Sequence, residues 1–248
     1  MENNSDRFTG KAGDYDAYRP DYPSRLIDYV IDRNVLTERD TVADIGAGTG
    51  KFARLLLERD IPVTAVEPNR DMRELGEKTL GEFSGFVSVN ATAEDTGIRS
   101  GRIALVVAAQ SFQWFDPDKF RLECRRILKP SRNVLLVWNC RDERNRMVME
   151  WRDLCVRHCP DFQGFSVKSS CPSGFFRDEK AEHREFRFRI TCDLDAFLGR
   201  NRSSSYAPNM EDPSYAAFEK DLTSLFRRYS KKGLLTIPMV ARSYLGKV

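Results

Sequence analysis

The stretch from Thr41 to Glu67 constrains the fold of this chain more strongly than any other part of the sequence. It reads TVADIGAGTGKFARLLLERDIPVTAVE, in which a short apolar run leads into three alternate glycines, a segment of helical spacing and a second apolar run. This order predicts a strand, a glycine turn, a helix and a second strand. Glycines let the backbone turn sharply and approach a ligand, and the start of the helix offers free N–H groups. Because a carboxylate at Glu67 can accept hydrogen bonds from both hydroxyls of a ribose, the stretch predicts a site for an adenosine-containing ligand.

The spacing of the glycines distinguishes between classes of ligand. A dinucleotide-binding turn has the pattern G-x-G-x-x-G, which requires a third glycine where this chain has Lys51. Here Asp44 is followed by Gly46, Gly48 and Gly50, and this pattern resembles motif I of the class I S-adenosylmethionine-dependent methyltransferases. The resemblance implies that the cofactor is S-adenosyl-L-methionine and the product S-adenosyl-L-homocysteine. A turn without a ligand would need one glycine and no paired acid.

The resemblance extends from Phe8 to about Leu245 and implies an α/β fold. That fold is a doubly wound, Rossmann-like sheet of seven strands, mostly parallel with an antiparallel last strand. We expect a single methyltransferase domain over residues 1–248, in which residues 1–34 cover the cofactor and residues 193–232 form a helical cover inserted before the last strand. Apolar runs predict the strands at 42–45, 63–66, 85–89, 103–109, 134–137, 185–190 and 234–244. A turn at 131–133 is expected before the fifth strand, where the family prefers glycine.

The N-terminal segment carries a second resemblance. Its pattern F-x-x-x-A-x-x-Y-x-x-Y-R-P-x-Y-P is similar to the opening of a small-molecule subgroup that includes the ubiquinone/menaquinone and trans-aconitate methyltransferases. The residue types alone allow either an aromatic clasp that packs the N-terminus or a cover over the ligand. In the second case Tyr15, Tyr18 and Arg19 contact the cofactor, and the guanidinium binds the carboxylate of the methionyl group. The resemblance favours the second interpretation.

Further cofactor contacts are implied by the family pattern in the loop at residues 90–98. The matching family residues flank the adenine, although many relatives have Asp in place of Thr92, and an ordinary loop is the alternative interpretation. The complete set of predicted cofactor-binding residues is Tyr15, Tyr18, Arg19, Asp44, Gly46, Ala47, Gly48, Gly50, Glu67, Pro68, Thr92, Ala93, Glu94 and Gln110.

The segment Gln110–Phe115, QSFQWF, follows the most continuous apolar run and lies at the edge where open α/β sheets bind ligands. Its aromatic residues either cap the core or face the sulfonium, which an aromatic surface stabilises by about 0.5 to 2 kcal/mol. Relatives often have His where this chain has Gln113, so the obvious general base is missing. This favours an acceptor that is already ionised, such as a carboxylate. The candidates for a catalytic role are Tyr18, Gln110 and Trp114.

Composition excludes several other classes of protein. The net charge is +3, with 40 basic and 37 acidic residues interspersed, so no nucleic-acid-binding tail is evident. No apolar run approaches the roughly 20 residues of a membrane span, and the first residues are too polar for a signal peptide. We therefore expect a cytoplasmic protein whose partner is a small molecule, with no nucleic acid and no membrane. The oligomeric state is not predicted.

Three alternatives remain. The alternating run at residues 185–190 suggests either RNA binding or an edge strand. The six cysteines are expected to be reduced. Cys155, His158 and Cys159 share a helical face that could hold zinc, with Cys171 or Cys192 as the fourth ligand. Buried thiols are the preferred interpretation, so no metal is predicted. Finally, the chain could bind S-adenosylmethionine without catalysis, whereas a nicotinamide-dependent oxidoreductase is disfavoured by Lys51.

Overall fold

The sheet of this protein has the strand order β3-β2-β1-β4-β5-β7-β6. The computed structural model describes residues 12–248 except 14–15, 17–18, 166–172, 205 and 210. Strands β1 to β5 pair in parallel, and β7 runs antiparallel to both of its neighbours. The predicted fold class is therefore confirmed. The strands are β1 Val42–Ile45, β2 Val63–Val66, β3 Phe86–Val89, β4 Ile103–Ala109, β5 Leu128–Arg141, β6 Ala181–Cys192 and β7 Leu235–Gly246.

Helices cover both faces of the sheet because the buried strands are apolar on both sides. Val107 faces a core that includes Leu26 of α2 and Phe52 of α3. Val106 faces the opposite core, which includes Phe120 of α5. The helices are α2 Ser24–Asn34, α3 Lys51–Leu57, α4 Arg70–Leu80, α5 Pro117–Ile127, α6 Arg146–His158, α7 Leu194–Arg202 and α8 Tyr215–Tyr229, with short 3₁₀ turns η2 Phe112–Trp114 and η3 Arg177–Glu179.

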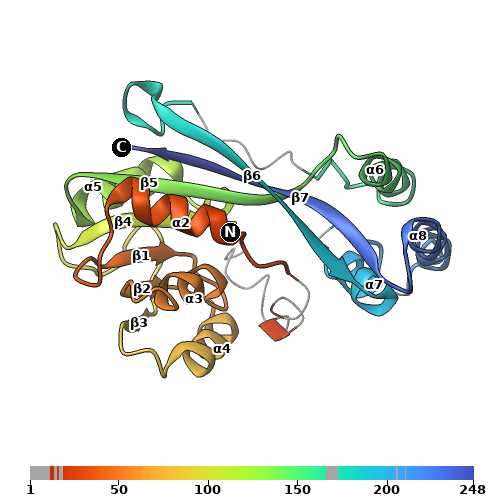
Figure 1. Ribbon diagram of the computed structural model, residues 1–248, viewed down its shortest axis with the longest axis horizontal. Helices are drawn as coiled ribbons and strands as arrows, with labels where there is room; N and C mark the ends of the chain where they lie inside the picture. Colours follow the sequence, from red (N-terminus) through yellow and green to blue (C-terminus); the bar gives the residue numbers. More distant parts are fainter. Residues whose placement is uncertain (1–11, 14–15, 17–18, 166–172, 205, 210) are drawn as a thin grey trace.

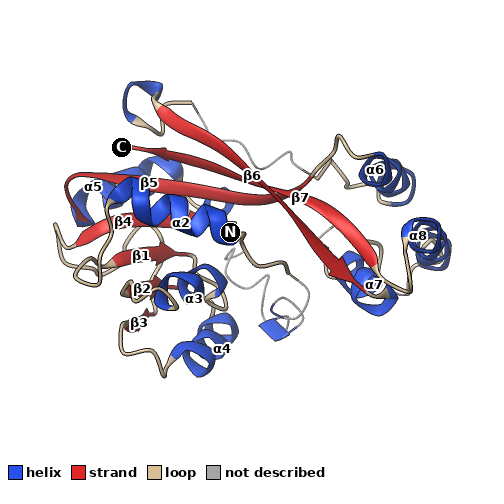
Figure 2. Cartoon of the chain, viewed as in Figure 1, coloured by secondary structure: helices blue, strands red, loops and turns tan. Residues whose placement is uncertain are grey.

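Three long strands carry a second group of helices away from this α/β unit. Strands β5, β6 and β7 have 14, 12 and 12 residues, whereas β1, β2 and β3 have four each. Helices α6, α7 and α8, the three-helix group, lie around the far end of the long strands (Figures 1 and 2). They share a separate core with fully buried Trp151, Phe197 and Phe218. Helices α7 and α8 lie within residues 193–232; that they cover a substrate remains a prediction.

The start of β5 differs from the sequence prediction. The strand begins at Leu128, so the expected turn at 131–133 is wrong. Instead Ser131 adopts a left-handed conformation at φ +62°, and the pairing with β4 shifts where Ile103 faces Leu128 and Leu105 faces Asn133. The extra residues form an irregularity inside the strand. The Asn133 amide donates to Oδ1 of Asn34 at 2.9 Å and ties this irregularity to the end of α2.

Strand β6 forms the edge of the sheet and is longer than the predicted 185–190. Its alternation is as expected: Arg187 and Arg189 are exposed, while Phe186, Phe188 and Ile190 are half-buried. Within the described ranges, no helix is both long and apolar enough to cross a membrane.

The separate core of the three-helix group leads to a prediction about stability. Phe197 is fully buried, so Phe197→Ala should lower the free energy of unfolding by about 3 to 5 kcal/mol. Val156 on α6 is 63% exposed, and the control Val156→Ala should change it by less than about 0.5 kcal/mol. Denaturant titration of both variants measures the difference. Equal losses in the two would contradict the assignment of Phe197 to a core.

Candidate cofactor site

The three glycines of the turn between β1 and α3 are required for different reasons. All have left-handed backbones, with φ +66° at Gly46, +60° at Gly48 and +83° at Gly50. A Cβ at Gly46 would lie 2.5 Å from the Cβ of Ser111, and one at Gly50 would collide with Cδ1 of Leu80. Beside Gly48, no atom of the described residues lies within 4 Å of such a Cβ. The first and third glycines therefore permit packing, while the middle one leaves open space against the turn.

Glu67, which follows β2, is fixed beside this open space. Its Oε2 accepts a hydrogen bond from the Gly48 N–H at 2.8 Å, and its Oε1 accepts one from the Asn69 N–H at 2.8 Å. Burial raises the pKa of the Glu67 carboxyl, and these two N–H groups partly oppose the shift. Each carboxylate oxygen has a second lone pair, so Glu67 can accept further hydrogen bonds from a ligand without losing those that position it.

Asp44 is a buried carboxyl at the end of β1. It is 1% exposed, and neither oxygen has a hydrogen-bond partner among the described residues. Burial raises the pKa of Asp44 to about 7, and the negative charge of Glu67 contributes to this rise. The backbone N–H of Ala53 opposes this rise in pKa but is not in hydrogen-bond geometry with either oxygen. Buried carboxylates are costly unless they are compensated. A cation or a hydrogen-bond donor from a ligand would supply that compensation.

The segment after β4 is held in place by two glutamine side chains. Gln110 has a left-handed backbone at φ +61°, and its Nε2 donates to the carbonyl of Asn139 at 2.9 Å. Gln113 donates through Nε2 to the carbonyl of Gln110 at 2.7 Å and accepts from Nε1 of Trp138 at 3.1 Å. Both ends of the Gln113 amide are thus used by the protein. The residue that replaces the histidine of relatives has a structural contact here.

The aromatic residues of the same segment divide into two kinds. Phe112 is 6% exposed and packs against the rings of Phe115, Phe120, Trp138 and Phe175, as the core-capping interpretation expects. Trp114 is half-buried and belongs to no described core cluster. Ser111 donates through Oγ to the carbonyl of Ile45 at 2.7 Å, which brings the segment against the glycine turn. Contact of Trp114 with a sulfonium remains a prediction.

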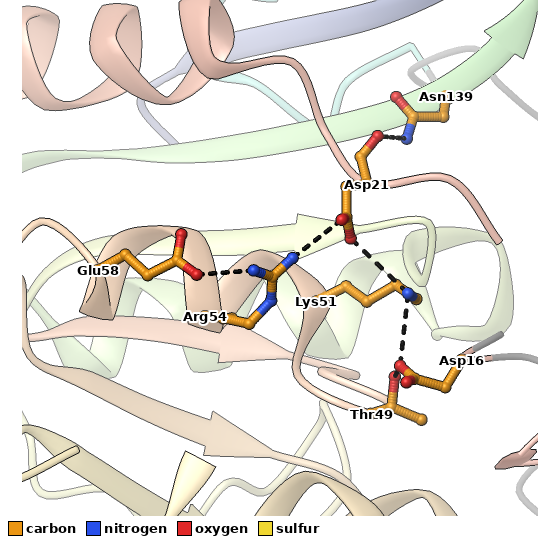
Figure 3. Close-up of polar contacts among 7 residues, drawn as sticks. All are labelled: Asp16, Asp21, Thr49, Lys51, Arg54, Glu58 and Asn139. Carbon is orange, nitrogen blue, oxygen red and sulfur yellow. Dashed lines mark hydrogen bonds and ion pairs between the residues drawn. The ribbon is translucent and has the colours of Figure 1, made fainter. Parts of the chain in front are cut away.

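The N-terminal segment is attached to the glycine turn by charged side chains that sequence reasoning missed (Figure 3). Oδ1 of Asp16 accepts from Oγ1 of Thr49 at 2.8 Å and lies 3.4 Å from Nζ of Lys51. Nζ of Lys51 also lies 3.7 Å from Oδ1 of Asp21. The lysine that breaks the dinucleotide pattern therefore joins two carboxylates of the segment. Its side chain is only 17% exposed, so these pairs are screened less than surface ones.

Two more contacts carry the segment from the turn to β5. Asp21 pairs through Oδ2 with Arg54 of α3 at 2.9 Å, and its carbonyl accepts from Nδ2 of Asn139 at 3.3 Å (Figure 3). Two acidic residues, 16 and 21, and two basic residues, 51 and 54, are visible in the sequence, but the acids and bases lie 30 or more positions apart. No local pattern predicts that they meet.

The remaining predicted residues are placed as follows. Ala47 donates its N–H to the carbonyl of Val66 at 3.1 Å, so it lies with the turn. Thr92 is exposed, Ala93 is 5% exposed, and Glu94 accepts through Oε1 from the N–H of Asp116 at 2.9 Å. The structure brings together Asp44, Gly46, Ala47, Gly48, Gly50, Glu67 and Pro68, with Gln110 beside them. Arg19 is half-buried; Tyr15 and Tyr18 lie outside the described residues.

The zinc alternative has no support in the part of the chain that the structure describes. No group of three His, Cys, Asp or Glu side chains there could hold a metal, and Cys171 lies outside it. Nε2 of His158 lies 2.9 Å from Oδ2 of Asp221. Cys155 and Cys159 are buried thiols, and burial raises the pKa of Cys155 to about 12.

Part of this chain is similar in sequence to known methyltransferases. Residues 43–136 match the family model of a methyltransferase domain. An uncharacterised methyltransferase of Mycobacterium tuberculosis is 34% identical over 150 residues, which are 60% of this chain and 59% of that protein. A malonyl-[acyl-carrier protein] O-methyltransferase of Geobacter sulfurreducens is 32% identical over 127 residues, 49% of this chain and 47% of that protein. The chain thus spans less than two thirds of the length of these relatives.

The fold is also that of a solved structure. A protein of Anaeromyxobacter dehalogenans assigned as a type II methyltransferase superposes with a TM-score of 0.69 at 23% identity, over 93% of this chain and 98% of the other. The structural similarity extends over the whole architecture, whereas the family model matches only the segment that contains the glycine turn. Residues 43–136 are thus similar to a methyltransferase domain, and the chain shares its fold with the Anaeromyxobacter dehalogenans structure.

Proposed function

We propose that this chain transfers a methyl group from S-adenosylmethionine to a small-molecule acceptor. The observation that carries the proposal is the space that the described residues leave beside Gly48, next to the fixed carboxylate of Glu67. Asp44, four residues before Gly48, is buried and has no hydrogen-bond partner among those residues. Glu67 would bind the ribose hydroxyls, and Asp44 would balance positive charge on the cofactor. The cofactor, when bound, supplies a methyl group already activated by the positive sulfonium.

The hydrogen bonds of the turn favour this cofactor over a dinucleotide. Dinucleotide sites direct free N–H groups at a pyrophosphate. Here the N–H groups of Gly46 and Ala47 donate to the carbonyl of Val66, and that of Gly48 donates to Glu67. A turn whose donors are already used by the protein suits a nucleoside cofactor without phosphates.

The protein's own contribution would be alignment and exclusion of water, which are the main requirements when the electrophile is already activated. Asp16 and Asp21 hold the N-terminal segment against Thr49 and Lys51. This attachment supports the prediction that the segment covers the cofactor, with Arg19 between its two anchors.

The acceptor is proposed to be ionised before it binds, such as a carboxylate. Gln113 occupies the position of the family's histidine, and both ends of its amide are engaged by the protein. The relative from Geobacter sulfurreducens is named for O-methyl transfer to malonyl-[acyl-carrier protein], whose malonyl group carries a carboxylate. That chemistry supports the same class of acceptor here.

Incubation with methyl-labelled S-adenosylmethionine and a panel of small organic acids tests the acceptor class. We expect base-labile methyl esters from acids and none from the corresponding amides. Methyl transfer to an unactivated alcohol or carbon would contradict an ionised acceptor. Binding of S-adenosylhomocysteine without transfer to any compound of a broad panel would favour the alternative, a non-catalytic cofactor-binding protein.

Two substitutions test the cofactor site. Glu67→Ala should weaken binding of S-adenosylhomocysteine by about 10- to 100-fold, because hydrogen bonds to a charged group are worth about 1.5 to 3 kcal/mol. Gly48→Val should weaken binding by filling the open space and straining the backbone at φ +60°. Calorimetric titration measures the affinities, thermal unfolding confirms that both variants are folded, and Glu82→Ala on the exposed surface is the control. Unchanged affinity in both variants overturns the site.

Asp44 gives the unliganded protein a defined pH dependence. Its pKa is about 7 in the folded protein and about 3.8 in the unfolded chain, so the folded state binds the proton more tightly. The contribution of Asp44 to the free energy of unfolding is fully present below about pH 4 and is lost as the pH rises to about 7. As the pH rises from 5 to 8, the free energy of unfolding of Asp44→Asn should increase relative to that of the wild type. The increase should be roughly 1.4 kcal/mol at most for each pH unit up to the folded-state pKa. Denaturant titration at both pH values measures this, and a constant difference would refute it.

A further inference from the structure

Arg141, the last residue of β5, carries a positive charge without a carboxylate partner. Its guanidinium carbon lies 4.1 Å from the ring centroid of Trp151 and 4.1 Å from that of Phe165. Aromatic faces attract the cation, but they do not take up the in-plane N–H groups that bind carboxylate or phosphate oxygens. No ion pair of Arg141 occurs within the described residues. The two rings therefore hold an anion-binding group in one place.

Arg200 belongs to α7, whose Phe197, three residues earlier, packs against the same Trp151 ring with the ring centroids 4.9 Å apart. The Nε of Arg200 is buried without a hydrogen-bond partner in the described part of the chain. Burial lowers the pKa of its guanidinium, the positive charges of Arg141 and Arg19 add to this, and the thiol of Cys192 opposes it. Among the described residues, no ion pair joins Arg200 to a carboxylate.

Some other buried charges in the described chain are compensated, unlike that of Asp44. Lys51 meets Asp16 and Asp21, and Glu123, which is 6% exposed, meets Arg126 at 2.7 Å. Burying like charges together without a counterion is strongly unfavourable. The neighbouring Arg141 and Arg200 are an exception that an anionic ligand would resolve.

Arg141 and Arg200 are placed to contact the acceptor and not the glycine turn. Arg141 lies two residues beyond Asn139 on β5, so both side chains project from the same face of the sheet. The backbone carbonyl of Asn139 accepts from Gln110, and its amide reaches the N-terminal segment at Asp21. Arg19 lies between Asp16, which is bound to the turn, and Asp21. Arg141 and Arg200 therefore lie beyond the predicted cofactor contacts, of which Arg19 is one, toward the three-helix group.

We propose that Arg141 and Arg200 bind an anionic group of the methyl acceptor, a carboxylate or a phosphate. This assignment rests on the proposed function, which supplies the acceptor. Guanidinium groups bind both kinds of oxyanion through paired N–H donors. The acceptor is then anchored by residues of β5 and α7 while its reactive atom points back toward the cofactor.

The test measures binding of two probes, succinate and inorganic phosphate, with and without S-adenosylhomocysteine. Arg141→Gln and Arg200→Gln should each weaken binding of the tighter probe at least tenfold and leave the affinity for S-adenosylhomocysteine within about twofold. Arg189→Gln removes an exposed arginine of β6 and is the matched control, for which both affinities should stay unchanged. Preference for succinate indicates a carboxylate acceptor, and preference for phosphate indicates a phosphorylated one.

Three results would overturn the proposal: no binding of either probe to the wild type at millimolar concentration, unchanged binding in both arginine variants, or equal losses in Arg189→Gln. Thermal unfolding checks each fold, and Arg200→Lys, which keeps the charge, should retain more affinity than Arg200→Gln. If the wild type fails to bind S-adenosylhomocysteine but still binds a probe through Arg141 and Arg200, the proposed methyl transfer fails while the anion site stands.

Discussion

The hydrogen bond from the Gly48 N–H to Glu67, at 2.8 Å, is the contact on which the site depends. It joins the turn after β1 to the residue after β2, and the N–H groups of Gly46 and Ala47 reinforce it by donating to the carbonyl of Val66. Parallel pairing alone brings the two strand ends side by side. The hydrogen bonds fix the distance between an open backbone and a carboxylate, and the N-terminal segment and the segment after β4 are then attached around that fixed pair.

Local patterns were sufficient to predict the part of the fold that holds this pair. Strands β1, β2 and β4 begin and end where the apolar runs do, because a strand that is buried on both faces consists mostly of apolar residues. The start of β5 was not predictable, since it depends on an irregularity at Ser131 and on a contact between Asn133 and Asn34, about 100 residues apart. Sequence spacing carries no information about such a pair.

The same limit applies to the candidate site. The acid and the glycines could be named from their spacing, whereas Asp16, Asp21 and Lys51 acquire their roles only when the N-terminal segment folds back on the turn. The replacement of histidine by Gln113 was visible in the sequence. Its contact with Trp138 of β5, however, joins residues 25 positions apart and required the structure.

The separation of the hydrophobic cores has a consequence for how such a chain diversifies. The three-helix group has its own core, and half-buried Phe188 packs against both that core and one core of the α/β unit. Substitutions around Trp151 or Phe197 are therefore absorbed locally, without repacking the strands that carry the glycine turn. The far end of the long strands can therefore change in sequence while β1, β2 and their turn stay the same.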